Sequence, residues 1–113
     1  MERSGRRVDL ASSKEYLDFI LEQLSELDEI TYRGMMGEYI IYYRSKVIGG
    51  IYDDRFLVKN IRRSADLMPE ATLELPYDGA KEMLLVDDVE NKGFLRELLE
   101  TMHDTLPAPK KRK

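Results

Sequence analysis

The chain has 113 residues, of which 42% are hydrophobic and 35% charged, and its formal net charge is −4. This length suffices for one domain with a single core, and the composition is that of a folded globular protein. The chain contains no cysteine, which excludes disulfide bonds and thiolate metal sites and is compatible with a reducing compartment. No apolar run approaches the roughly 20 residues of a membrane helix. The first ten residues lack the apolar segment of a secretory signal, so the cytoplasm is the expected location.

Basic residues gather at both ends of this acidic chain. Arg3, Arg6 and Arg7 lie among the first ten residues, and the last four, Lys110–Lys113, are all Lys or Arg. The body between them is therefore more acidic than the whole chain and would repel the phosphate backbone of DNA. We expect residues 107–113 to be a disordered, solubilising tail. Weak, salt-sensitive binding of nucleic acid through that tail is the alternative.

The first predicted element is an amphipathic helix over residues 13–27. Its apolar positions recur at helical spacing and are Leu17, Ile20, Leu21, Leu24 and Leu27. The preceding Ser12-Ser13-Lys14-Glu15 is typical of a capping box, in which a serine oxygen accepts from a backbone amide and Glu15 reaches back. Residues 1–11 show no periodicity and are expected to be a disordered lead-in or an extension of the gene start. The domain is then predicted to span residues 12–106.

Three strands are predicted next, over residues 38–43, 46–52 and 55–59. They are rich in Ile, Val, Tyr and Phe, which favour strands. Arg44-Ser45 is the expected two-residue loop of the first hairpin, and Asp53-Asp54 makes the next tight turn. Ser45 is less favourable than glycine in such a loop, because glycine accepts a positive φ there at no steric cost and serine does not.

The remaining predicted elements are a helix, two strands and a closing helix. A short helix over residues 61–68 ends at Pro69, strands follow over 72–75 and 81–86, and a helix over 91–103 closes the domain. The predicted fold class is α+β, a two-layer domain with a five-stranded antiparallel sheet and helices on one face, in the order α-β-β-β-α-β-β-α.

The hairpin of residues 38–52 is apolar or aromatic on both faces. Because side chains alternate along a strand, one face would carry Ile40, Tyr42, Val47, Gly49 and Ile51. The other would carry Tyr39, Ile41, Tyr43, Ile48, Gly50 and Tyr52. Helices would bury one face, and the other would expose a patch typical of an interface. We expect the partner interface to comprise Tyr39, Ile41, Tyr43, Ile48 and Tyr52. The partner would be a second copy, giving a homodimer, or another protein; cover by a segment of the same chain is the alternative.

A set of residues resembles the N-terminal domain of the TfoX/Sxy competence regulators. Arg33, Met35, Met36 and Gly37 stand where that family has its Arg, Met-Phe and Gly ahead of the first strand. Further matches follow in order at Tyr42, Lys46, Asp53-Asp54, Phe56-Leu57-Val58-Lys59 and Pro76-Tyr77. The resemblance covers residues 13–103, with departures at Met36, Glu38 and Ser45, where the family more often has Phe, Gly and Gly.

This resemblance implies both a fold and a role. The fold is that of the type III secretion chaperones, an antiparallel five-stranded sheet with helices packed on it. The role is help in switching on DNA-uptake genes through contacts with the cyclic-AMP receptor protein, not catalysis. The named members of the family carry a second, C-terminal domain, which this sequence does not contain.

No constellation of residues predicts catalysis or a metal site. Asp87, Asp88, Glu90 and Asn91 lack the spacing of a calcium loop and are expected to cap the last helix. Asp53-Asp54 serves a turn, and His103, the sole histidine, lies near the end of the last helix without a nucleophilic partner. The glycines do not form a phosphate loop and are expected at a strand entry and at a bulge or close approach; they are Gly34, Gly37, Gly49 and Gly50.

A small basic cluster, Lys59, Arg62 and Arg63, is expected to be a solvated face, and contact with an anion or an acidic partner is the alternative. Taken together, these patterns predict a non-enzymatic protein-interaction or regulatory module with no cofactor. A small-molecule-binding domain or minor enzyme is the first alternative, and a nucleic-acid-binding accessory acting through the basic tail is the second.

Overall fold

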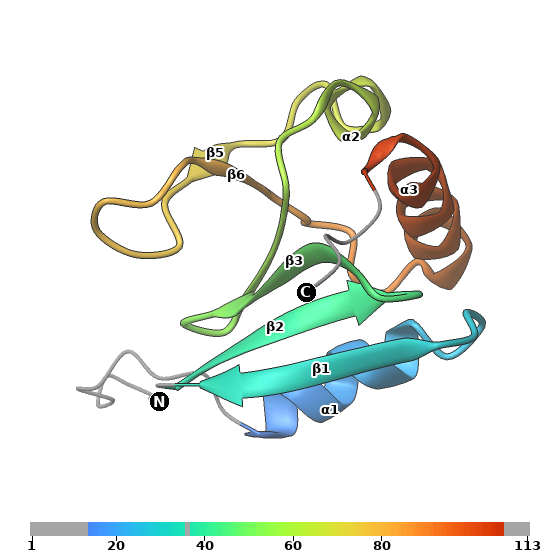
Figure 1. Cartoon of the computed structure of the whole chain (residues 1–113), viewed down its shortest axis with the longest axis horizontal. Coiled ribbons are helices and arrows are strands. Elements are labelled where there is room, and N and C mark those ends of the chain that lie inside the picture. The colour runs from blue at the N-terminus through green and yellow to red at the C-terminus, as the bar shows by residue number, and fades with distance from the viewer. Residues whose placement is uncertain (1–13, 36, 108–113) are drawn as a thin grey trace, which may run out of the picture.

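A computed structural model of the chain describes residues 14–35 and 37–107. The elements in chain order are α1 (Lys14–Gln23), β1 (Ile30–Met35), β2 (Glu38–Tyr43), β3 (Lys46–Tyr52), β4 (Arg55–Val58), α2 (Arg62–Leu67), β5 (Leu73–Glu74), β6 (Met83–Leu85) and α3 (Lys92–Thr105). The strands form one open sheet in the order β1-β2-β3-β4-β6-β5, and every neighbouring pair is antiparallel (Figure 1). The chain is therefore an α+β protein, as predicted.

Strand β1 is the element that the sequence analysis missed, so the predicted count of five strands is wrong. The described residues form six strands. Residues 33–37 were expected to lead into the first strand, but β1 pairs with β2 along its whole length, from Ile30 opposite Tyr43 to Met35 opposite Glu38. Its sequence gives a weak strand signal, because its residues 31–34 are exposed and it contains a glycine, which disfavours strands.

The other predicted elements are present, β2 and β3 with the predicted bounds and the rest with shifted ends. Helix α1 ends at Gln23 rather than at residue 27, and Leu24 and Leu27 are buried in the turns that follow. Both predicted tight turns are confirmed, because Arg44 and Ser45 have φ of 50° and 73°, and Asp53 and Asp54 have φ of 53° and 54°. The capping box expected at residues 12–15 and the basic tail lie wholly or partly outside the described residues.

One hydrophobic core lies between the helices and one face of the sheet. In Figure 1, α1 lies behind β1, while α2 and α3 lie beside each other at the upper right. The fully buried side chains of this core come from both layers and include Leu17, Ile20, Ile41, Ile48, Ile51, Phe56, Val58, Leu95, Leu98, Leu99 and Met102. Burying each large side chain contributes about 1.5–3 kcal/mol. No helix of the described part of the chain is long and apolar enough to cross a membrane.

A β-bulge in β3 decides which of its side chains face this core. Tyr42 pairs with Val47, whereas Ile41 pairs with Gly49, so Ile48 is an extra residue in β3. Beyond the bulge, the alternation of β3 is shifted by one residue relative to β2.

The predicted faces of the hairpin are therefore correct for β2 and wrong for the second half of β3. Ile51 lies opposite Tyr39, and Gly50 lies opposite Ile40. Residues paired across antiparallel strands share a face, so Ile51 belongs to the core face and Tyr52 to the opposite face. A hydrophobic pattern read without the bulge gives the reverse assignment.

Candidate functional site

The five residues predicted to form a partner interface are not an exposed patch in this chain. Ile41 and Ile48 are fully buried, and Tyr43 is 4% exposed, because α1 and α3 pack against this face. Tyr39 is half-buried and packs against the same core. Tyr52 is also buried, but it lies on the opposite face of the sheet. The sequence shows two apolar faces; it does not show which of them the helices cover.

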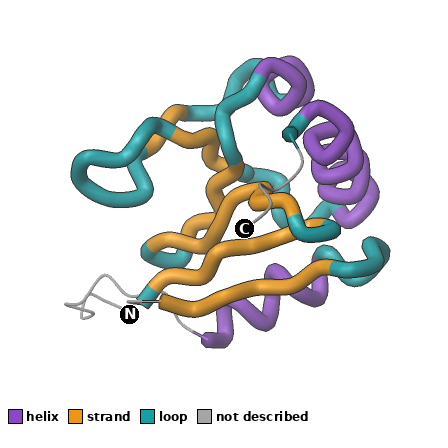
Figure 2. The backbone as a smooth tube through the Cα atoms, in the orientation of Figure 1, coloured by secondary structure: helices purple, strands orange, loops and turns teal. Residues whose placement is uncertain are grey.

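The face opposite the core carries a groove of about 500 Å³, which we call the tyrosine–lysine groove. It lies between β3, the segment 59–61 that follows β4, and the loop that joins β5 to β6. That loop stands out from the body of the molecule in Figure 2. The residues that line the groove are Val47, Gly49, Tyr52, Lys59, Asn60, Ile61, Pro76, Tyr77, Ala80, Lys81, Glu82 and Met83.

Two tyrosines lie together in the groove. The ring centroids of Tyr52 and Tyr77 are 6.3 Å apart, and the ring planes are tilted by 56°. Tyr77 is 55% exposed, whereas Tyr52 is buried. Burial raises the pKa of the Tyr52 hydroxyl, and the nearby Glu38 and Tyr77 raise it further. The Tyr52 hydroxyl therefore keeps its proton at neutral pH and can donate a hydrogen bond.

Two lysines, Lys59 and Lys81, line the same groove and are both exposed. Lys59 belongs to the basic cluster predicted from the sequence, whereas Arg62 and Arg63 are exposed on α2 and do not line the groove. The sequence gives no sign that Lys81 belongs with Lys59, because Lys81 comes from the β5–β6 loop, in a distant part of the chain, to line the same groove. The groove thus presents two ammonium groups beside two phenol rings, with Glu82 as its acidic lining residue.

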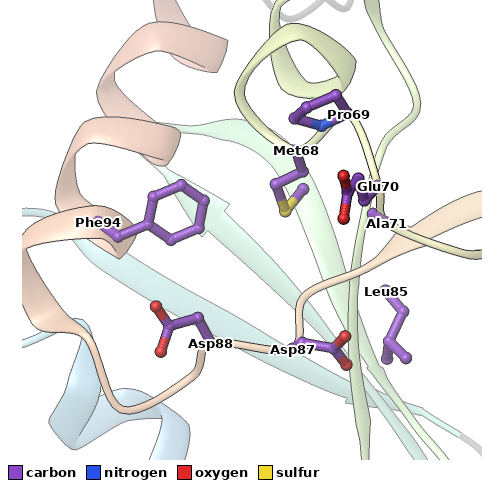
Figure 3. A pocket seen from close by; sticks show the side chains of 8 residues that line it. All are labelled: Met68, Pro69, Glu70, Ala71, Leu85, Asp87, Asp88 and Phe94. Atoms are coloured by element: carbon purple, nitrogen blue, oxygen red, sulfur yellow. The ribbon is translucent and has the colours of Figure 1, made fainter.

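A second pocket, of about 390 Å³, lies where α2, β6 and α3 meet. We call it the acidic pocket (Figure 3). Figure 3 shows the Met68 side chain near its centre, with the Phe94 ring on one side and the Glu70 and Asp88 carboxylates around it. The described residues include no group of three or more side chains placed to hold a metal ion. Three acidic residues, Glu70, Asp87 and Asp88, line the acidic pocket, so it differs in charge from the tyrosine–lysine groove.

The acidic residues at this pocket include those predicted to begin the last helix. The Asn91 side chain accepts a hydrogen bond from the backbone N–H of Phe94 at 3.0 Å, which confirms Asn91 as the N-cap of α3. Asp88 in turn accepts a hydrogen bond from the Asn91 amide at 3.2 Å. Asp87 lines the acidic pocket, and Glu90 is exposed in the turn before α3.

The other residues singled out in the sequence lie apart from both cavities. Asp53 and Asp54 form the turn between β3 and β4, as predicted. His103 lies in the last turn of α3, where its ring meets that of Tyr43 edge to face at 5.2 Å between centroids. This contact is aromatic packing at the edge of the core and brings no nucleophile to the imidazole.

The residues that carry the family resemblance lie around the first hairpin. Arg33 is exposed on β1, and Met35 is the last residue of that strand. Gly37 has a φ of 83°, a conformation that favours glycine, and lies in the turn between β1 and β2. Met36 lies outside the described residues. The motif therefore forms a strand end and a hairpin turn, not the lead-in to a first strand.

The architecture is that of an α+β domain with an open antiparallel sheet. The chain is 32% identical over 105 residues to the uncharacterized 12.7 kDa protein in the trpE 5′ region of Spirochaeta aurantia, and the alignment covers 92% of this chain and 91% of that protein. The chain belongs to the same family as this Spirochaeta aurantia protein. No protein-family model matches the chain. No solved structure matches it either.

Proposed function

We propose that the chain is a protein-interaction module that binds an acidic partner segment in the tyrosine–lysine groove and acts through this contact, not through catalysis. The observation that carries the proposal is the juxtaposition of Lys59 and Lys81 with the tyrosine pair Tyr52 and Tyr77, in one groove on the sheet face opposite the core. Tyrosine is enriched at interfaces because its ring buries area while its hydroxyl keeps a hydrogen-bonding partner.

The lining residues define the chemistry of the partner segment. Carboxylates of the partner would face Lys59 and Lys81, and an aromatic or aliphatic side chain would lie against Tyr77 and Met83. A groove of about 500 Å³ holds a few side chains, since ligand pockets are usually about 300–1,000 Å³. Exposed charges steer and select a partner more than they tighten its binding, so the affinity depends mainly on the apolar and aromatic contacts.

The resemblance to the TfoX/Sxy N-terminal domain supports a regulatory role for this contact. The matching residues include Arg33, Gly37, Lys46 and Lys59. The implied fold is likewise an antiparallel sheet with helices packed on it, although it has five strands where the described residues of this chain form six. Within that resemblance, Lys59 and Pro76-Tyr77 come from motif positions, so three of the matched residues line the groove.

A pair of labelled peptides tests the proposal. Fluorescence anisotropy would compare a fluorescein-labelled peptide of glutamates around one phenylalanine with a peptide of lysines around the same phenylalanine. We expect only the acidic peptide to bind, and Lys59→Glu or Lys81→Glu to weaken binding about tenfold at low salt. Arg96→Glu, on the exposed side of α3, makes the same change of charge outside the groove and should leave binding unchanged.

Two results would reject this function. One is equal binding of the acidic and basic peptides, and the other is an acidic peptide whose affinity is the same for the parent, Lys59→Glu and Lys81→Glu. If benzoate displaced the acidic peptide as effectively as unlabelled peptide does, the groove would be better described as a small-molecule site.

A further inference from the structure

Strand β1 leaves one of its edges without a partner among the described strands. It lies at the end of the sheet order and pairs with β2 alone. At six residues it is the long edge of the sheet, since β5 at the opposite edge has two. Proteins usually protect such an edge with lysine, proline, a bulge or a covering segment, because its backbone groups are ready to pair with another strand. β1 contains neither lysine nor proline.

The hydrogen-bond pattern shows which backbone groups point outward from this edge. The backbone N–H of Arg44 donates to the carbonyl oxygen of Glu29 at 3.1 Å, so these two residues are a directly bonded pair. Antiparallel strands alternate bonded and non-bonded pairs, which assigns Thr31 and Arg33 to bonds with β2. The backbone groups of Ile30, Tyr32 and Gly34 therefore point away from the sheet, along the open edge.

The side chains along this edge include one exposed aromatic residue and residues of both charges. Tyr32 is 44% exposed, although it is a large aromatic residue, and Arg33 is exposed. Glu29 is also exposed; its carboxylate is 3.9 Å from the Arg44 guanidinium, and both side chains are more than half exposed, so this pair is weak and leaves the carboxylate accessible. Glu29 precedes β1 and has a φ of 63°, so this acid lies at the entry to the strand and not within it. The edge itself has an aromatic residue near its middle and a base beyond it.

We propose that a second copy of the chain pairs with β1 in an antiparallel, two-fold symmetric arrangement centred on Thr31. In this register Ile30 of each copy lies opposite Tyr32 of the other, and their outward backbone groups bond across the new interface. Glu29, at the entry to β1 of each copy, then lies near Arg33 of the other, at the end of the shared ladder. Cross-strand pairs of aromatic with β-branched residues and of opposite charges both stabilise antiparallel sheets. The result is one sheet that continues through both copies.

The charge pattern selects both this occupant and this register. A pairing centred on Arg33 would place the two arginines opposite each other, which is unfavourable. A pairing centred on Tyr32 would place Arg33 opposite Thr31 and leave Glu29 without a cationic partner. An isologous interface must be self-complementary. The succession of Ile30, Thr31 and Tyr32 meets this condition by itself, with Glu29 before it and Arg33 after it, whereas a foreign strand would have to supply matching side chains.

Light scattering coupled to size-exclusion chromatography of the whole chain, over a range of concentrations, tests the proposal. We expect a dimer for the parent protein and a dissociation constant raised about tenfold or more by Arg33→Glu or by Glu29→Arg, because each change brings like charges close together twice, once at each end of the shared ladder. The double variant Glu29→Arg with Arg33→Glu restores opposite charges and should recover the dimer. Arg62→Glu, an exposed change of the same charge on α2, should leave the dimer intact.

A proline variant tests the backbone contacts separately. Tyr32→Pro removes an N–H that points outward, so the monomer should stay folded, as judged by circular dichroism, while the dimer is lost. A parent protein that is monomeric up to high concentration would overturn the proposal. A dimer that withstands both single charge reversals would overturn it as well, as would a double variant that fails to recover. These experiments do not depend on the tyrosine–lysine groove, whose peptide binding is measured separately.

Discussion

The ammonium group of Lys46 donates a hydrogen bond to the carbonyl oxygen of Leu106 at 2.7 Å, and it also reaches the carbonyl oxygen of His103 at 2.9 Å. These oxygens lie at the C-terminal end of α3, where backbone acceptors lack helical partners and the helix dipole is negative. Because Lys46 begins β3, this contact fastens the β2–β3 hairpin to the last helix. It keeps α3 packed on the core face of the sheet, which is the face that the sequence analysis expected to be open.

Replacing Lys46 by methionine should destabilise the protein by about 1–2 kcal/mol, because two charge-assisted hydrogen bonds are lost while the aliphatic stem is kept. The measurement is urea unfolding followed by circular dichroism. Arg63→Met is the matched control, since Arg63 is exposed on α2 and its loss should change the free energy of unfolding by less than about 0.5 kcal/mol. Equal effects of the two substitutions would mean that the Lys46 contact contributes nothing specific.

Ser45→Gly should stabilise the protein by about 0.5–1 kcal/mol. Ser45 has a φ of 73°, a left-handed conformation that costs an L-residue about 1 kcal/mol and costs glycine almost nothing. Ser25→Gly is the control, because Ser25 is exposed and is not among the residues with positive φ; there the greater freedom of glycine in the unfolded chain should destabilise slightly. A melting temperature that falls for Ser45→Gly would contradict the strain argument.

Gly49→Ala should destabilise the protein by at least about 2 kcal/mol. A Cβ atom at Gly49 would lie 2.1 Å from the Leu57 carbonyl oxygen and 2.7 Å from the Val58 Cα atom, so the backbones of β3 and β4 would have to separate. At Gly93, in the first turn of α3, the new Cβ would be 3.7 Å from the Asn91 Oδ1 atom, an ordinary contact. Gly93→Ala should therefore stabilise by about 0.5–1 kcal/mol. Chemical unfolding of both variants distinguishes the two effects by their sign.

The stability of the protein should fall in alkaline solution, partly because of Tyr52. Burial raises the pKa of Tyr52 above its ordinary value of 10.0, so the folded state keeps a proton that the unfolded state loses. This contribution is fully present below pH 10 and is lost as the pH rises through the raised pKa. Tyr52→Phe should make the loss of stability above pH 10 shallower, although Tyr16, whose pKa is raised in the same direction, still contributes. Unfolding curves of parent and variant at pH 8 and pH 11 give the comparison, and identical slopes would refute it.

Local sequence patterns predict most of the fold because they act within a few residues. The apolar spacing around Leu17 and Ile20 predicts α1, and Asn91 predicts the start of α3 through its capping side chain. The pairs Arg44-Ser45 and Asp53-Asp54 predict the tight turns. Local patterns do not predict strand β1, because its stability comes from pairing with β2 and not from its own composition.

The orientation of the hairpin and the composition of the groove could not be predicted, because both depend on contacts between distant segments. The bulge at Ile48 reverses the facing of later residues in β3, and its signal, Gly49, is compatible with several backbone roles. Lys59 and Lys81 line one groove, because β6 pairs with β4. The alternation of the hairpin therefore predicts a partner face that includes Ile41, which the helices bury.

The strand order has a consequence for how the chain assembles. β1 to β4 are consecutive in sequence and in space, so each new strand pairs with one that has just formed, and such hairpins close within about 1–10 μs. β6 pairs with β4 only after the chain has passed through α2 and β5, as in the pairing of Leu57 with Leu85, and this longer closure costs more entropy. The meander is therefore expected to form the folding nucleus, and the β5–β6 ribbon to dock afterwards. The tyrosine–lysine groove, which needs both parts, would then be completed in the last step of folding.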